Sequence, residues 1–335
     1  MDLSKVDAEL RRKTRAAAAE SFSKYRHREE PAPPPPGATV TFLGTGGNPE
    51  AVLSQVPRTA GFVLVVNGLR LYVDPGPGAV VRAQEAGIDL GALDGIFISH
   101  GHLDHYAGAE AVIEGMCWGM FSRRGYLMAP RQMLERDRLL SCYHQGLKTH
   151  TGYKGGPTVI LLQAHQPIQI KKAVLTPVPV HHTEENYGFV LNTGNVSIGY
   201  TSDTNYIKSY STPEGIKEMG RRGPIMDLLE VVDYRRDIKE MFSQVDVLIA
   251  NVTSHNVYAH RHITTLGLPH LLQGSKVKLC FITHFNHCCL RPEDLRPAMA
   301  AYVENRSGVR TLYAADGAVY DIEAILKQLA ENSTG

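Results

Sequence analysis

The sequence predicts an α/β fold in which two mixed β-sheets pack face to face with helices on the outside. Short apolar runs typical of buried strands recur between residues 38 and 322, and helical segments fall between many of them. Two of these runs, Phe62–Val66 and Leu69–Val73, flank Asn67-Gly68, the favoured two-residue turn of a β-hairpin. With 335 residues, 43% of them hydrophobic and 21% charged, the chain can bury a sizeable core.

The predicted elements follow in order from local patterns. Strands are expected where apolar residues run together, at residues 39–43, 62–66, 69–73, 95–99, 174–180, 189–191, 197–200, 245–250, 278–283, 311–313 and 319–322. Helices are expected at residues 80–86, 109–116, 213–219, 225–242, 267–272 and 292–303. The first strand runs into a glycine-rich turn, and a segment rich in proline and glycine, 74–78, ends the hairpin.

The N-terminal segment differs in composition from the remainder. Residues 1–30 are rich in alanine and charged residues, which predicts a helix, and their eight Lys/Arg against six Asp/Glu favour a solvated helix over a nucleic-acid contact. Five prolines between residues 31 and 36 predict a stiff spacer. We therefore expect an arm and linker at 1–37 and one large domain at 38–335. Insertions are expected near 115–170 and 205–240; the second carries seven residues of each charge and is expected to form a cap or a dimer contact.

Overall charge and cysteine usage limit the functional classes. A formal net charge of +1 argues against a protein that binds nucleic acid or an anionic membrane through bulk charge alone. The cysteines at 117, 142, 280, 288 and 289 form no CxxC pair, which favours a reducing compartment. The N-terminus shows no apolar signal core, and the chain contains no run of 18 apolar residues. We expect a cytoplasmic protein that does not cross a membrane.

The strongest chemical signal is the segment His100-Gly101-His102-Leu103-Asp104-His105, which directly follows a predicted strand. Residues i and i+2 of an extended segment project the same way, so His100 and His102 can bind one ion. Asp104 and His105 lie beyond the turn and can reach a second ion. Imidazole and carboxylate are ligands for zinc, iron or manganese, and this segment contains no thiolate that would favour a softer metal.

Three other strand ends supply further ligands of the same kind. His181 and His182 end one predicted strand, Asp203 follows another, and His284 follows a third. Loops that follow neighbouring strands can meet at one edge of a sheet, so we expect these side chains to join the first segment.

The order of these residues resembles the metallo-β-lactamase superfamily over residues 38–322. Within it, "LGTGG" at 43–47 resembles the opening strand of the ribonuclease Z and phosphodiesterase branch, and Asp74 in "VDPGPG" resembles an acidic residue that braces the metal-bearing loop. The resemblance implies an αββα four-layer sandwich. It also implies that one metal is held by His100, His102 and His182, that a second is held by Asp104, His105 and His284, and that Asp203 bridges them. His182 is preferred to His181 because the glycine of the next strand follows it six residues later, as in ribonuclease Z.

Three further segments resemble the phosphodiester-cleaving branch. "TSDT" at 201–204 is similar to its "SGDT", "THF" at 283–285 matches its "THF", and "RHIT" at 261–264 is similar to its "GHST". The resemblance makes His262 a candidate proton donor to the leaving group. In that branch a glutamate partners this histidine, whereas the matching position here is Asn251, which cannot take a proton. We therefore expect His262 to be tuned differently, which argues against strict tRNA processing.

The predicted function is hydrolysis by a hydroxide that bridges two divalent metal ions, with Zn²⁺ expected ahead of Mn²⁺ or Fe²⁺. Asp104 would orient the hydroxide and accept its proton, so Asp104 and His262 are the candidate catalytic residues. The expected substrate is a small-molecule or nucleotide phosphodiester, with RNA as a further candidate, and the expected assembly is a homodimer. Two alternatives stay open: a thioester, ester or lactone hydrolase on the same site, and a non-catalytic binding subunit stabilised by metal.

Overall fold

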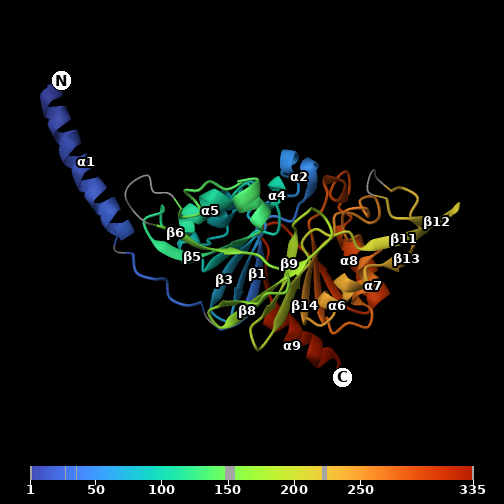
Figure 1. The fold of residues 1–335 in the computed structure, drawn as a ribbon. Coiled ribbons are helices and arrows are strands. Elements are labelled where there is room, and N and C mark those ends of the chain that lie inside the picture. The colour runs from blue at the N-terminus through green and yellow to red at the C-terminus, as the bar shows by residue number, and fades with distance from the viewer. Residues whose placement is uncertain (1, 27, 35, 148–154, 221–224, 334–335) are drawn as a thin grey trace.

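Two seven-stranded sheets form the centre of the computed structural model (Figure 1), which describes residues 2–26, 28–34, 36–147, 155–220 and 225–333. The first sheet has the order β17-β1-β2-β3-β4-β5-β6. Its strands are β1 (Ala38–Phe42), β2 (Phe62–Val66), β3 (Leu69–Val73), β4 (Gly95–Phe97), β5 (Arg123–Ala129), β6 (Gly156–Leu161) and β17 (Val319–Asp321). Both antiparallel and parallel pairs occur within it, so the sheet is mixed as predicted.

The second sheet has the order β16-β15-β14-β10-β9-β8-β7 and is also mixed. Its strands are β7 (Ile168–Ile170), β8 (Ala173–Pro179), β9 (Tyr187–Asn192), β10 (Ser197–Tyr200), β14 (Val247–Asn251), β15 (Leu279–Thr283) and β16 (Arg310–Tyr313). Strands β10, β14, β15 and β16 run parallel, so the loops after them lie at one edge of the sheet. This edge carries much of the site described below.

Aromatic side chains from both sheets meet in the core between them. Phe62 of the first sheet packs against Tyr200 of the second with ring centroids 5.2 Å apart, and Phe97 packs against Phe189 at 5.0 Å. Aromatic residues bury the largest apolar areas of any side chains, so these pairs account for much of the attraction between the layers. The two sheets therefore pack face to face through a continuous apolar core.

Helices cover the outer faces of both sheets and complete the four-layer α/β sandwich. On the first sheet, buried residues of α3 (Ala79–Glu85) and α5 (Ala109–Met116) share a core with the strands. On the second, α6 (Arg236–Phe242), α7 (Leu268–Leu272) and α8 (Arg296–Ser307) do the same. The remaining helices are α1 (Leu3–Arg26), α2 (Asn48–Ser54), α4 (Leu103–Tyr106) and α9 (Ile322–Ser333). The fold prediction is confirmed.

The prediction of helices within the 205–240 insertion was largely wrong. A third sheet of order β12-β11-β13 occupies this region, built from β11 (Ile207–Thr212), β12 (Gly215–Glu218) and β13 (Glu230–Tyr234). Instead of the predicted helix at 213–219, a hairpin turns at Pro213 and Glu214. Gly215 follows the turn with a φ of +127°, which disfavours other residues. Adjacent β-branched valines in β13 favour a strand, so only α6 remains of the helix predicted at 225–242. Residues 221–224, and 148–154 in the other insertion, lie outside the described residues.

The N-terminal helix α1 projects from the body of the molecule (Figure 1), and its described side chains are exposed. After it, Arg28 pairs with Asp89 and lies over the ring of Trp118, 5.5 Å from the centroid. Arg124 lies over the same ring at 4.9 Å, and the Trp118 indole N–H donates to the Gly91 carbonyl at 3.0 Å. The two contacts of Arg28 attach the arm to the body, while the division into an arm at 1–37 and a domain at 38–335 stays a prediction.

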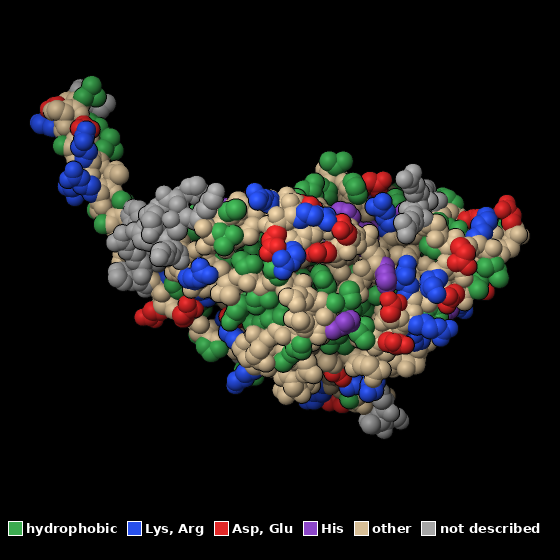
Figure 2. All heavy atoms as spheres, in the orientation of Figure 1, with side chains coloured by type: hydrophobic (Ala, Val, Ile, Leu, Met, Phe, Trp, Pro, Cys, Tyr) green, Lys and Arg blue, Asp and Glu red, His purple; other side chains and the backbone are tan. Residues whose placement is uncertain are grey.

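The described surface has no dominant charge sign on the face shown in Figure 2, where basic and acidic side chains are interspersed. Among the described helices, none combines the length and the apolar character that a membrane-spanning segment needs.

Candidate metal centre

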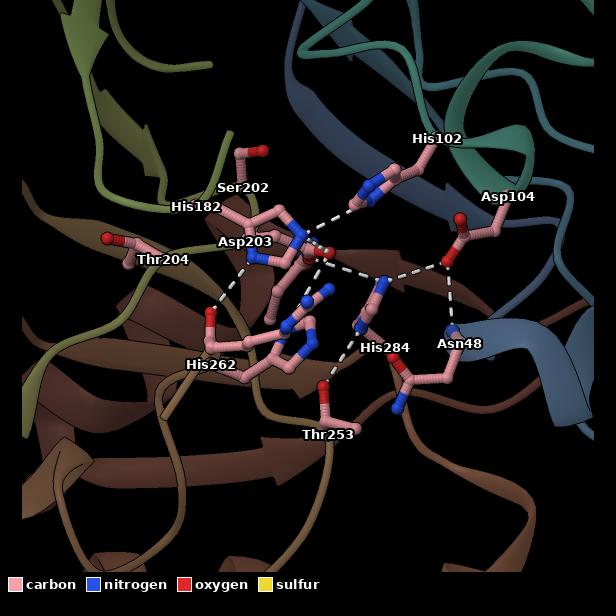
Figure 3. Close-up of polar contacts among 12 residues, drawn as sticks. Asn48, His102, Asp104, His182, Ser202, Asp203, Thr204, Thr253, His262 and His284 are labelled. Atoms are coloured by element: carbon pink, nitrogen blue, oxygen red, sulfur yellow. Dashed lines mark hydrogen bonds and ion pairs between the residues drawn. The ribbon is translucent and has the colours of Figure 1, made fainter. Parts of the chain in front are cut away.

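The predicted site residues meet where the loops after several strands converge. His100 and His102 lie between β4 and α4, and Asp104 and His105 belong to α4 itself. From the second sheet, His182 follows β8, Asp203 follows β10 and His284 follows β15. Figure 3 shows the two groups facing each other, with His102 and Asp104 opposite His182, Asp203 and His284.

All seven predicted metal ligands lie in overlapping clusters of donor atoms. Within each cluster, the ligand atoms lie within 4.8 Å of one another. The clusters are His100, His102, His182 and Asp203; Asp104, His105 and His284; and Asp203, His262 and His284. The first two correspond to the two metal positions that the family resemblance implies, and Asp203 and His284 join them through the third.

The donor set fits divalent metal ions. His102 Nδ1 lies 2.9 Å from His100 Nε2 and 3.1 Å from His182 Nε2, and His105 Nε2 lies 3.1 Å from His284 Nε2. A neutral imidazole has one N–H and one lone pair, so ring nitrogens that crowd together cannot all satisfy one another. His262 Nδ1 is also buried without a hydrogen-bond partner in the described structure. Cations placed among these nitrogens and carboxylates would satisfy them.

Outer contacts hold the imidazole rings in orientations suited to binding. The Nδ1 atoms of three rings contact oxygen atoms: His105 meets Asp74 at 2.8 Å, His182 meets the Arg261 carbonyl at 3.0 Å, and His284 meets the Thr253 hydroxyl at 3.1 Å. When Nδ1–H donates outward, the Nε2 lone pair faces the centre. This arrangement is typical of histidines that bind metal.

Asp74 connects the two sheets behind the site. Its carboxylate accepts hydrogen bonds from the Ser99 backbone N–H and hydroxyl, both at 2.7 Å, and from the Tyr200 hydroxyl at 2.6 Å, in addition to the contact with His105. Ser99 immediately precedes His100. The contacts thus hold the histidine-bearing loop against β10, as expected of the brace that the family resemblance implies.

Asp203 lies at the middle of the histidines and is buried. Its Oδ1 lies 3.2 Å from His284 Nε2, and its Oδ2 lies 3.3 Å from His105 Nε2 and 3.6 Å from His182 Nε2. Burial alone would raise the pKa of Asp203, but His284, His105 and His262 hold it well below its ordinary value. Burial would likewise raise the pKa of Asp104, but His105 and His284 lower it. Both carboxylates are therefore ionised at neutral pH.

Most histidines of the centre are neutral. Burial lowers the pKa of His100, His102 and His262, and lowers that of His182 to about 4. His105 differs: burial would lower its pKa, but the carboxylates of Asp203, Asp104 and Asp74 raise it well above its ordinary value. A metal ion would compete with that proton, because a ligating imidazole must be neutral.

The structure places His182, and not His181, in the centre. His181 Nε2 instead lies 2.6 Å from the carboxylate of Asp237 in α6, and its ring is partly exposed. The side chains of these adjacent residues therefore face opposite ways.

Asn251 contacts Asp203, whereas the family resemblance would pair the residue at this position with His262. The side-chain amide of Asn251 donates to Asp203 Oδ1 at 2.8 Å and to the Tyr200 hydroxyl at 3.1 Å. Among the described residues, Asn251 makes no hydrogen bond to His262. His262 Nδ1 lies 3.6 Å from Asp203 Oδ2 instead. Asn251 therefore orients the carboxylate of Asp203, a role that the sequence analysis did not predict.

Other contacts at the site carry no signal in the sequence. The hydroxyl of Thr253 meets His284, and the backbone N–H of Asn48 donates to Asp104 Oδ2 at 2.9 Å. A threonine hydroxyl and a backbone amide are common features, so only the folded arrangement identifies them.

Comparison with known proteins places this fold and site in a family. Residues 69–285, more than half of the chain, match the Beta-lactamase superfamily domain. An uncharacterized protein of Methanocaldococcus jannaschii is 34% identical over 176 residues, which make up 50% of this chain and 62% of that protein. The Ribonuclease Z of Methanopyrus kandleri is 39% identical over 67 residues, 20% of this chain and 23% of that enzyme.

The chain thus spans less than two thirds of the length of these two relatives. A solved structure, the metallo-β-lactamase fold protein YhfI from Bacillus subtilis, matches with a TM-score of 0.61 and 17% identity, covering 84% of this chain and 98% of that one. At that identity the match shows the shared fold. The family match over residues 69–285 establishes that the chain belongs to the metallo-β-lactamase superfamily.

Proposed function

We propose that this chain is a metal-dependent hydrolase with two metal ions that cleaves phosphodiesters. The observation that carries the proposal is the convergence of seven histidine and aspartate side chains into two clusters, which Asp203 and His284 connect. The phosphodiester as substrate is supported by the relatives named Ribonuclease Z and by the matching segments around Asp203, His262 and His284.

His100, His102 and His182 would hold one ion, Asp104, His105 and His284 would hold the other, and Asp203 would contact both. Bound ions would supply Lewis acidity and a water of lowered pKa. Nitrogen-rich sites of this kind suit Zn²⁺, with Mn²⁺ or Fe²⁺ as alternatives.

The protein groups orient the reactants and move protons. The Asp104 carboxylate is ionised, and Asn48 fixes its Oδ2, so it can orient an attacking water and accept a proton from it. His262 is proposed to face the leaving oxygen. Because burial keeps His262 neutral, its single N–H would donate a hydrogen bond to that oxygen and would not transfer a proton to it.

A direct test measures metal content and diester cleavage in the same samples. We expect about two metal ions per chain and metal-dependent hydrolysis of bis-p-nitrophenyl phosphate, with both reduced in Asp203→Ala. His181→Ala is the matched control, because its ring contacts Asp237 outside the centre, and it should retain metal and activity.

Other outcomes would redirect or overturn the proposal. Turnover of only a thioester or lactone by the metal-loaded protein would keep the metal centre and reject the phosphodiester. A folded wild-type protein that binds no added metal would favour a binding subunit. Homodimer formation and a cytoplasmic location stay predictions from the sequence.

A further inference from the structure

The pocket beside the metal centre has two walls of different chemistry. It has a volume of about 440 Å³. One wall is apolar and comes from Pro49, Val52 and Leu53 of α2, together with Leu103. Leu53 is 86% exposed and Leu103 56% exposed, so both present apolar surface to whatever enters the pocket. The opposite wall holds metal-centre histidines and Arg261.

The backbone of Arg261 is fixed while its side chain faces solvent. Its carbonyl meets His182 Nδ1 at 3.0 Å, and its N–H donates to the Tyr258 carbonyl at 3.0 Å. No carboxylate of the described residues forms an ion pair with the Arg261 guanidinium. By contrast, the exposed Arg136 pairs with Glu184 at 2.7 Å. Arg261 therefore offers its charge at the pocket.

Arg261 lines the same pocket as the metal-centre residues His102 and His182, and its backbone carbonyl contacts the His182 ring. A guanidinium presents N–H donors in a planar fork that matches two phosphoryl oxygens. An anionic group bound beside His102 would thus find a cation already in place.

We infer that this pocket recognises a small phosphodiester that carries one apolar ester group. Arg261 binds the phosphoryl oxygens, and the wall formed by α2 and Leu103 holds the apolar group. The inference rests on the proposed phosphodiesterase function and adds the substrate class. The pocket volume suits a small molecule. The near-neutral chain, with a net charge of +1, favours such a ligand over a long polyanion.

Two synthetic diesters with the same leaving group test the apolar wall. Phenyl p-nitrophenyl phosphate and methyl p-nitrophenyl phosphate both release p-nitrophenolate and differ only in the ester group that is retained. We expect wild type to prefer the phenyl diester in kcat/KM. Leu53→Ser should reduce that preference by about threefold to tenfold, as expected for losing part of one apolar contact. Leu229→Ser is the control, because Leu229 is 55% exposed and does not line the pocket.

Arginine variants test the anion contact. Arg261→Gln should lower kcat/KM for both diesters by about 10- to 100-fold, mainly through KM, because a charged hydrogen bond to the substrate is lost. Arg261→Lys should recover part of the loss. Metal content should stay at the wild-type value, since the backbone carbonyl that contacts His182 remains. Arg123→Gln, at an exposed arginine of β5 outside the pocket, is the matched control.

The outcomes separate this inference from the proposed function. If the metal-loaded wild type cleaves neither diester, nor any other, the phosphodiesterase proposal itself fails. If it cleaves both equally well and Arg261→Gln has no effect on KM, the enzyme assignment stands and the inferred recognition is overturned. Faster cleavage of a single-stranded RNA than of either aryl diester would also overturn it, in favour of a polynucleotide substrate.

Discussion

The two sides of the metal centre are built in different ways. The side next to the first sheet takes His100, His102, Asp104 and His105 from six consecutive residues after β4. The side next to the second sheet takes its candidate ligands one at a time, after β8, β10 and β15. A short segment can supply several ligands by local geometry alone, whereas the other side depends on correct pairing of strands that are distant in the sequence. Loss of sheet register should therefore damage the second side first.

Replacement of Asp203, which contacts histidines from both sides, should have the largest effect. Asp203→Asn keeps the shape of the side chain but removes the negative charge among His105, His182 and His284. Activity should fall by more than the roughly 10- to 100-fold that is typical when an outer partner of a ligand is lost. Metal titration and diester kinetics measure this effect. Retention of both metal ions with near-normal kcat would show that Asp203 does not join the two sides.

The brace behind the first side should be next in importance. Asp74→Asn removes charge from a carboxylate that accepts from Ser99, Tyr200 and His105. We expect metal affinity to fall by about 10- to 100-fold. The free energy of unfolding of the metal-free protein should fall by about 2 kcal/mol, measured by urea denaturation. An unchanged affinity would mean that the six-residue segment positions itself without the brace.

A single contact on the second side should matter less. Thr253→Val keeps the side-chain shape but removes the hydroxyl that meets His284 Nδ1 at 3.1 Å. Only one ligand loses its orientation, so metal affinity should fall by about tenfold, at the lower end of such effects. Competition with a zinc chelator measures the change. A loss as large as that of Asp74→Asn would show that the two sides depend equally on their outer contacts.

The smallest effect is the pH dependence of the metal-free protein. The pKa of His182 is lowered to about 4, so between pH 6.5 and pH 4 the unfolded chain binds a proton that the folded chain does not. The contribution of His182 to stability should therefore be complete above pH 6.5 and be lost as the pH falls toward 4. His100 and His262 act in the same direction, and His105, whose pKa is raised, opposes them.

Thermal melting in the presence of a chelator, at pH 7.5 and pH 5, measures this dependence. His182→Gln should show a smaller difference between the two melting temperatures than wild type. If the variant and wild type decline in parallel, His182 does not govern the acid response.

The same contrast explains what the sequence could predict. The six-residue segment after β4 indicated metal chemistry by itself, and strand ends indicated His182, Asp203 and His284, which the structure brings into the same centre. The contact of Asn251 with Asp203 could not be predicted, because it depends on how β14 pairs with β10. The strands of the 205–240 insertion were missed because hairpin pairing there, and not helical periodicity, decides the local structure.

The attachment of the arm has a practical consequence for spectroscopy. Trp118 is the only tryptophan of the chain, and the guanidinium groups of Arg28 and Arg124 lie over its ring. Its intrinsic fluorescence therefore reports on the junction between the arm and the body. Release of Arg28 would change the surroundings of the indole and shift its emission, so a fluorimeter can follow detachment of the arm without an introduced label.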